Sequence, residues 1–148
     1  MDLKIRDPKP EDKAQWLELW DGYLAFYKQE LSHQQTELTW ERLLHAKDGL
    51  HAIVAELDGQ LVGLAHYFWT PSTWQQNKDL YLEDLFVSPS VRGKGVGKAL
   101  IEALVDVCLK AGGSKVHWQT HQTNQTAIAL YEKLAKQSEF VVFKIKAV

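Results

Sequence analysis

A short, basic and glycine-rich segment is the part of the sequence best suited to chemistry. Residues 91–98 read Val-Arg-Gly-Lys-Gly-Val-Gly-Lys, so three glycines and three cations fall within seven residues. An apolar run precedes the segment and a long amphipathic pattern follows it, which predicts the N-terminus of a helix. The first amide groups of a helix have no partner within it, and the helix dipole adds partial positive charge there. We therefore expect an anion to bind at this turn, where glycine lets a phosphate approach the backbone.

Two familiar nucleotide motifs do not fit this segment. A Walker loop needs glycine in place of Arg92 and Ser or Thr in place of Ala99, and the dinucleotide fingerprint needs a third glycine in place of Lys98. A helix-starting turn with a solvated run of charges remains the alternative, which glycines alone do not exclude.

Two adjacent carboxylates interrupt the apolar run before this turn. Glu83 projects from a strand otherwise lined by Tyr81, Leu85 and Val87, where burial raises the pKa of a carboxylate towards the range of a general base. The alternative for Glu83 is an ion pair with a lysine or arginine of a neighbouring element. Strict alternation predicts that Asp84 points to the opposite face, where it caps, pairs or binds a cation.

The pattern Arg92-x-x-Gly95-x-Gly97, between a strand and a helix, resembles the GNAT superfamily of acetyltransferases. The run from Tyr81 to Pro89 is similar to the matching strand of the diamine or polyamine acetyltransferase branch, and Asn124-x-x-Ala127-x-x-x-Tyr131 is similar to the family's second cofactor helix. One departure is Glu139, where relatives usually have glycine. The resemblance implies acetyl-CoA as acyl donor, bound by Leu85, Phe86, Val87, Arg92, Gly93, Lys94, Gly95, Val96, Gly97, Lys98, Asn124 and Tyr131.

The reaction implied is direct attack of a primary amine on acetyl-CoA in a ternary complex. Such an amine is mostly protonated at neutral pH, so Glu83 is the expected base, directly or through one water. A backbone N–H freed by a splay or bulge at residues 85–87 is expected to stabilise the oxyanion. Tyr131 is expected to protonate the leaving thiolate, unless it is simply a core residue. Asn124 either caps a helix, contacts the cofactor, or does both.

A cationic acceptor such as a diamine, polyamine or lysine-like amine is expected from aromatic and acidic residues near this site. The candidates are Trp20, Tyr23, Tyr27, Trp74, Glu83 and Asp84, although the aromatic residues fit a hydrophobic core equally well. Two other functions stay open: a protein lysine or N-terminal acetyltransferase, and a non-catalytic acyl-CoA sensor. The resemblance also implies a homodimer, for which the apolar run from Phe140 to Phe143 could supply the interface.

The elements that must position these residues follow from hydrophobic periodicity. Strands are predicted at 3–6, 50–57, 60–70, 80–87, 115–120 and 140–145, with a tight turn at Asp58-Gly59. Helices are predicted from Pro10 to about Tyr27, at 39–46, at 95–111 and from an N-cap at Asn124. The order predicts one α/β domain over 1–148 with the GNAT fold. Its mixed, mostly antiparallel sheet would have six to seven strands, about four flanking helices, and a splay between the fourth and fifth strands.

Composition limits the partners. With 148 residues, 45% of them hydrophobic, the chain suits one globular domain, and a net charge of -2 argues against nucleic acid. No apolar run is long enough for a membrane span or signal peptide, and the single Cys108 is typical of a reducing compartment, so a cytoplasmic protein is expected. The six histidines have no metal-binding spacing, so no metal is expected.

Overall fold

A computed structural model describes residues 2–148 and divides the chain into two compact units, which we describe separately. The first ends at Trp118 and contains β1 (Leu3–Arg6), η1 (Pro10–Asp12), α1 (Lys13–Phe26), α2 (His33–Leu44), η2 (Lys47–Gly49), β2 (His51–Leu57), β3 (Gln60–Thr70), β4 (Asp79–Val87), η3 (Pro89–Val91), α3 (Val96–Lys110) and β5 (Val116–His117). The second runs from Gln119 to Val148 and contains α4 (Gln125–Leu134).

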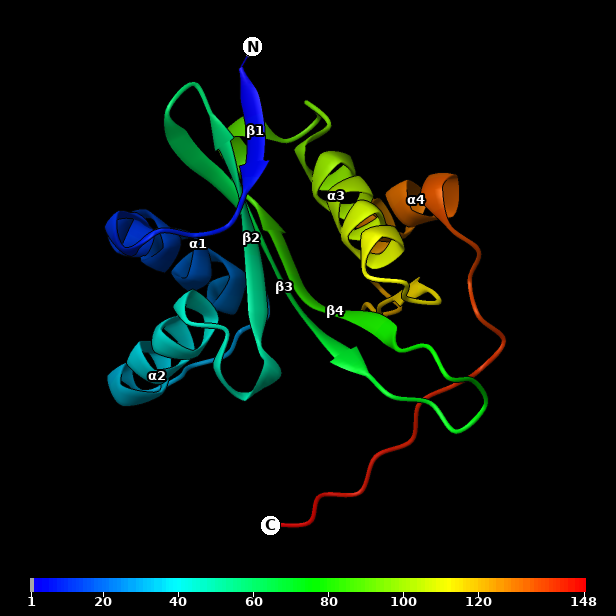
Figure 1. The fold of residues 1–148 in the computed structure, drawn as a ribbon. Helices are drawn as coiled ribbons and strands as arrows, with labels where there is room; N and C mark the ends of the chain where they lie inside the picture. Colours follow the sequence, from blue (N-terminus) through cyan, green and yellow to red (C-terminus); the bar gives the residue numbers. More distant parts are fainter. Residues whose placement is uncertain (1) are drawn as a thin grey trace. The chain divides into compact units, whose positions relative to one another are not determined.

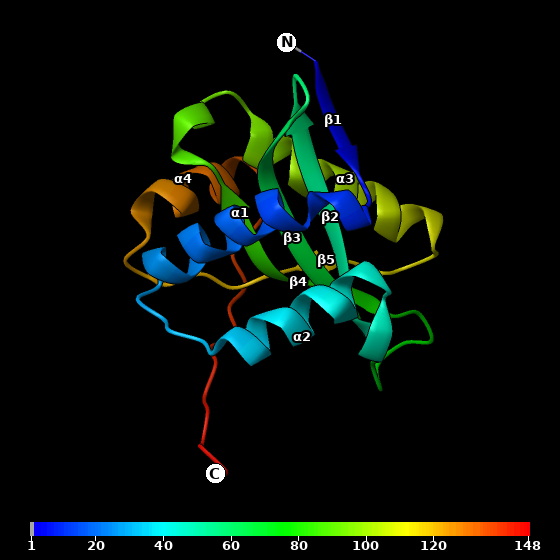
Figure 2. The ribbon, with the colours of Figure 1, turned by 90° about the vertical axis from the view of Figure 1, so that its left-hand side faces the viewer.

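The first unit is built on a single sheet with the strand order β1-β2-β3-β4-β5. The first four strands are antiparallel neighbours, and β5 runs parallel to β4. Helices α1 and α2 cover one face and α3 covers the other (Figures 1 and 2). This arrangement confirms the predicted fold class.

The described residues form five strands rather than six or seven, because residues 140–145 form no strand. The second unit contains no other strand with which this segment could pair its backbone. The prediction of a strand there, made from β-branched and aromatic residues alone, is therefore wrong for this structure.

Helix α1 carries its two tryptophans into the core, as their spacing predicted. Trp16, Leu19 and Trp20 are buried and pack against Val54 of β2 and Leu64 of β3. Helix α2 begins at His33, six residues before the predicted start at Thr39. The Ser32 hydroxyl caps it by accepting a hydrogen bond from the Gln35 N–H at 3.0 Å, a start signal that the apolar pattern did not reveal.

The turn between β2 and β3 has the predicted geometry. Asp58 and Gly59 adopt φ angles of 50° and 85°, and Leu57 lies opposite Gln60 across the turn. Positive φ at both central residues is the signature of the two-residue turn that Asp-Gly favours.

Strand β5 is shorter than predicted and leaves most of β4 without a partner on that side. Pairing is confined to Leu80 with Val116 and Tyr81 with His117. Beyond Tyr81, no strand in residues 2–148 pairs with this edge of β4. The predicted splay between the fourth and fifth strands is therefore confirmed.

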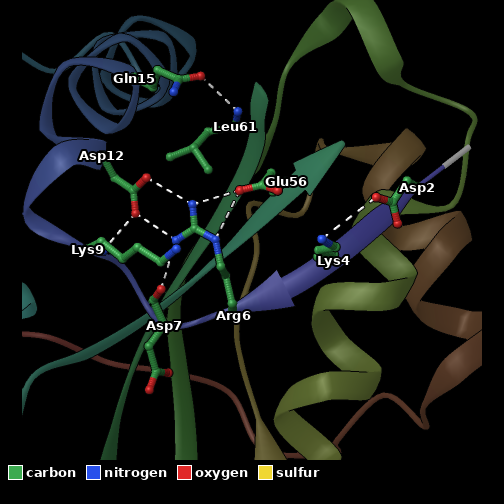
Figure 3. Close-up of polar contacts among 9 residues, drawn as sticks. All are labelled: Asp2, Lys4, Arg6, Asp7, Lys9, Asp12, Gln15, Glu56 and Leu61. Atoms are coloured by element: carbon green, nitrogen blue, oxygen red, sulfur yellow. Dashed lines mark hydrogen bonds and ion pairs between the residues drawn. The ribbon is translucent and has the colours of Figure 1, made fainter. Parts of the chain in front are cut away.

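An arginine-centred network ties the N-terminal strand to the rest of the first unit (Figure 3). The Arg6 guanidinium donates to both carboxylate oxygens of Asp12, at 2.8 and 3.0 Å, and to Glu56 of β2 at 2.9 Å. Asp12 is 5% exposed and also accepts from the Lys9 N–H at 2.7 Å. Hydrogen bonding to Arg6 is the main reason that the pKa of Asp12 lies below its ordinary value.

Candidate active site

Strand β4 contains a β-bulge at Glu83. Leu82 lies opposite Tyr67 and Asp84 lies opposite His66, so Glu83 is an extra residue without a partner in β3. The bulge therefore occurs before Leu85, whereas the sequence prediction placed it at residues 85–87. Those three residues remain in regular register with β3.

The bulge brings the two carboxylates to the same face of the sheet. Tyr81 and Asp84 lie opposite Phe68 and His66, two residues of β3 that share a face. Glu83 lies on this side as well, because the charges of Asp84 and of Arg42 in α2 both act on its carboxylate. The prediction that Asp84 points to the opposite face is wrong, because it assumed uninterrupted alternation.

Asp84 is held by a buried series of hydrogen-bonded side chains. Its Oδ2 lies 3.0 Å from Nδ1 of His66, and Nε2 of His66 accepts a hydrogen bond from the Trp16 indole N–H at 3.1 Å. His66 is 3% exposed and Trp16 is 1% exposed, whereas the Asp84 side chain keeps 14% exposure. Sequence spacing gave no sign of this hydrogen-bonded series, because His66 lies 50 residues from Trp16 and 18 residues from Asp84.

Tyr23 of α1 approaches the same carboxylate. Burial is the main reason that the pKa of the Tyr23 phenol lies far above its ordinary value, and the negative charge of Asp84 adds to the effect. Its phenol therefore remains protonated at neutral pH and can act as a hydrogen-bond donor.

Glu83 remains accessible to solvent but is partly desolvated by its neighbours. Loss of hydration is the first cause that raises its pKa above the ordinary value, and repulsion by Asp84 is the second. Arg42 of α2 opposes this shift. No residue in the described range forms an ion pair with Glu83, so the alternative interpretation of this residue as an ion-pair partner finds no support. Glu83 has the features of a general base.

The open edge of β4 presents backbone donors. The Ser88 N–H donates to the Val62 carbonyl of the β3 side at 2.8 Å. Because amide directions alternate along a strand, the N–H groups of Leu85 and Val87 point to the opposite edge, where β4 has no strand partner in the described chain. Phe86, between them, directs its side chain to the face of α1.

The glycine turn begins α3 with uncapped amides. Gly93 and Gly95 adopt φ angles of 82° and 79°, and no atom lies within 4 Å of the position that a Cβ would take at either residue. Glycine is therefore required by the backbone conformation and not by packing. No side chain caps the helix at Gly95, and the first intrahelical bond runs from the Ala99 N–H to the Gly95 carbonyl. The N–H groups of residues 96–98 therefore suit an anion.

The cations of this turn are exposed, as is usual for charges that meet a ligand. Arg92, Lys94 and Lys98 lie at the surface, whereas Val96 is buried and anchors the helix in the core. The Arg92 guanidinium stacks over the Phe86 ring, 5.9 Å from its centroid.

An open pocket of about 560 Å³ lies between α1 and the segment that joins β4 to α3. It is lined by Gln15, Glu18, Leu19, Gly22, Ala25, Phe26, Leu61, Phe86, Ser88, Pro89 and Arg92. Its lining includes neither Glu83 nor Asp84. Phe86 lines the pocket and also contacts Tyr23, with ring centroids 6.4 Å apart.

The predicted acceptor aromatics divide into a stacked row and one separate residue. Trp20 stacks on Tyr23 at 5.2 Å, and Tyr23 contacts Tyr27 at 4.9 Å. Trp20 is buried, so the core interpretation applies to it, whereas Tyr27 is 39% exposed. Trp74 lies apart from this row in the loop between β3 and β4, with 87% of its surface exposed.

Asn124 and Tyr131 belong to the second unit. The Asn124 side chain caps α4 by accepting from the Ala127 N–H at 3.4 Å, which confirms its predicted capping role. Tyr131 lies on α4, seven residues further along, and is partly buried. The cofactor roles of both residues stay predictions.

Neither a membrane-spanning helix nor a metal-binding group is found within residues 2–148. None of the helices there is both long and apolar enough to cross a bilayer. No cluster of three or more His, Cys, Asp or Glu side chains is arranged to hold a metal ion in that range.

Comparison with known families decides what this arrangement represents. A model described as the acetyltransferase (GNAT) family matches residues 14–135. The chain belongs to the GNAT family. The match covers the carboxylate pair, the open edge of β4 and the glycine turn.

Relatives of this GNAT protein include characterised N-acetyltransferases. The chain is 30% identical to a D-amino-acid N-acetyltransferase of Saccharomyces cerevisiae, over 96% of this chain and 89% of the relative. It is 31% identical to the thialysine N-epsilon-acetyltransferase of Mus musculus, over 90% of this chain and 84% of the relative. A solved structure of AAC(6')-Iy with a bisubstrate analogue matches the fold with a TM-score of 0.86, at 22% identity and full coverage of both chains.

This GNAT protein is an acetyl-CoA-dependent N-acetyltransferase. The uncapped amides of α3 and the open edge of β4 fit a phosphate and an amide-containing arm, respectively. The superfamily assignment made from the sequence is therefore confirmed, and a non-catalytic acyl-CoA sensor is not supported.

Proposed function

We propose that this protein acetylates the primary amine of a small cationic acceptor: a diamine, a polyamine or a lysine-like amino compound. The amine attacks acetyl-CoA directly while both substrates are bound. The observation that carries the proposal is the β4 bulge, which puts Glu83 and Asp84 together on the face covered by α1 and α2.

The two carboxylates have different tasks in this mechanism. Glu83 has no ion-pair partner in the described chain and a raised pKa, so it takes a proton from the acceptor's ammonium group, and the free amine then attacks the thioester carbon. Asp84 is fixed by His66 and supplies a negative charge for the cationic acceptor. Tyr23 and Tyr27 add aromatic faces, which favour contact with a cation.

The remaining groups serve the acyl donor. Acetyl-CoA supplies the activated acetyl group, whose C–S bond breaks as the new C–N bond forms. The uncapped amides of residues 96–98 would hold its pyrophosphate, and the outward N–H groups of Leu85 and Val87 would hold its arm and stabilise the oxyanion. Tyr131 would give a proton to the thiolate, with Asn124 contacting the cofactor as well as capping α4.

The relatives support a small amine. Their names describe acetylation of D-amino acids and of the ε-amine of thialysine, both compact molecules that carry a primary amine. We also propose a homodimer, because residues 140–145 expose the apolar side chains of Phe140, Val141, Val142, Phe143 and Ile145.

The test is release of free thiol from acetyl-CoA with a panel of acceptors. The panel contains putrescine, spermidine, lysine, thialysine and a lysine-containing peptide, with butylamine as a control that keeps the amine but has no second positive charge. We expect kcat/KM for putrescine to exceed that for butylamine by about tenfold or more, because the second ammonium group of putrescine makes one charge-assisted contact. Equal rates with butylamine would contradict the cationic site. Preference for a lysine-containing peptide over every small amine would instead indicate a protein acetyltransferase.

A further inference from the structure

His66 is a buried imidazole whose two nitrogens both have partners. Nε2 lies 3.1 Å from the Trp16 indole nitrogen and Nδ1 lies 3.0 Å from Oδ2 of Asp84. The ring also packs against Trp16 and Trp20, with centroid distances of 6.0 and 5.2 Å. With 3% of its surface exposed, it is out of reach of bulk solvent.

The Trp16 contact determines where the imidazole proton resides. An indole N–H can only donate a hydrogen bond, so Nε2 of His66 must act as acceptor and carry no proton. The proton of the neutral ring is therefore on Nδ1, directed at Asp84. A second proton on Nε2 would break the Trp16 hydrogen bond and leave the indole donor unsatisfied in the core.

We infer that His66 is a positioning residue, locked by Trp16 as the Nδ1–H tautomer, which holds the Asp84 carboxylate in place for the cationic part of the acceptor. This inference rests on the proposed function in taking Asp84 as the group that receives the cation. His66 cannot itself act as the base, because its only proton-accepting nitrogen is occupied and buried.

The surroundings explain why Asp84 needs a fixed donor. Glu83 and Asp84 are neighbours on one face and repel each other when both are ionised. Tyr23 approaches Asp84 from α1, and the charge of Arg42 in α2 acts on Glu83. Burial raises the pKa of Tyr81 in β4, and both carboxylates raise it further. Among these groups, His66 is the one that reaches Asp84 from β3, and its contact with the carboxylate is 3.0 Å long.

The test uses two substitutions that separate the imidazole's hydrogen bond from its bulk. His66→Asn keeps an N–H at about the position of Nδ1, whereas His66→Leu removes it. His51→Leu is the matched control, because His51 likewise packs against an aromatic ring, that of Tyr67 in β3, but has no hydrogen bond to the carboxylate pair. The readout is the ratio of kcat/KM for putrescine to kcat/KM for butylamine, with KM for acetyl-CoA measured alongside.

We expect His66→Leu to lower the putrescine-to-butylamine ratio about tenfold, with KM for acetyl-CoA unchanged, and His66→Asn to restore most of it. In an Asp84→Asn background, His66→Leu should change the ratio no further, because its effect passes through Asp84. A wild-type enzyme without preference for putrescine would refute the proposed cationic site itself. A wild-type preference that survives in His66→Leu would overturn only the role of His66.

Nitrogen-15 NMR of the wild-type protein gives a measurement independent of folding in the variants. At pH 7 we expect His66 to show one protonated nitrogen, Nδ1, with a slowly exchanging proton. An Nε2–H tautomer or an imidazolium would overturn the inference even if the enzyme acetylates diamines.

Discussion

The Arg6 network shows how single ionised residues contribute to the stability of the first unit. Asp12 is nearly buried and accepts three hydrogen bonds, two of them from one guanidinium. A mostly buried carboxylate that loses its charge weakens two charge-assisted hydrogen bonds from Arg6 and leaves Glu56 as the one carboxylate paired with the guanidinium in the described chain, which costs more than an exposed ion pair is worth.

We therefore predict that Asp12→Asn lowers the free energy of unfolding by about 2 kcal/mol at pH 7, measured by urea denaturation. Because the folded-state pKa of Asp12 is lowered, its contribution is complete above its ordinary pKa and is lost as the pH falls through the folded value. The difference in the free energy of unfolding between the wild type and Asp12→Asn should thus shrink below about pH 4. Glu37→Gln, which breaks an exposed ion pair with Lys13, should have a much smaller effect. A loss for Asp12→Asn that is no larger than for Glu37→Gln would contradict this account.

The residue types predicted the chemistry of the site better than they predicted the geometry of the site. The motif at residues 92–97 predicted a helix start, which the structure shows with uncapped amides, and the partial desolvation expected for Glu83 is present. The side to which Asp84 points was wrong, because a bulge depends on the register between two strands and leaves no local mark in the sequence. His66 was missed for the same reason: its partners come from α1 and β4.

At the scale of elements, the predictions succeeded where local signals agree with packing. The Asp58-Gly59 turn, α3 and the Asn124 cap all formed as expected, since each depends on residues close in sequence. Strand β5 is only two residues long, because its length depends on how far β4 stays alongside it. That early divergence leaves the outward amides of β4 without a strand partner in residues 2–148, as the proposed binding of the acyl donor requires.

At the scale of the whole molecule, the apolar segment of residues 140–145 is the feature that most needs a partner. Its five large apolar side chains are each at least 70% exposed, and such segments promote association between chains. A second copy of the chain is the partner that we propose.

We predict that the protein sediments as a dimer in analytical ultracentrifugation, and that Val142→Lys shifts it to monomer by placing a charge in the interface. Lys144→Glu changes a charge in the same segment without removing apolar surface and serves as the control. A monomeric wild-type protein, or a Val142→Lys variant that remains dimeric, would refute this interface.

The most direct test of the mechanism is the pH dependence of kcat for putrescine acetylation in Glu83→Gln. With Glu83 as base, wild-type activity should rise with pH through the raised pKa of this carboxyl, and the variant should lose that limb. Its kcat at pH 7 should fall by about 10²- to 10³-fold, with KM for acetyl-CoA unchanged. Glu102→Gln, on the exposed side of α3, should behave as wild type. A Glu83→Gln enzyme with wild-type kcat and an unaltered pH profile would contradict the central role given to the β4 bulge.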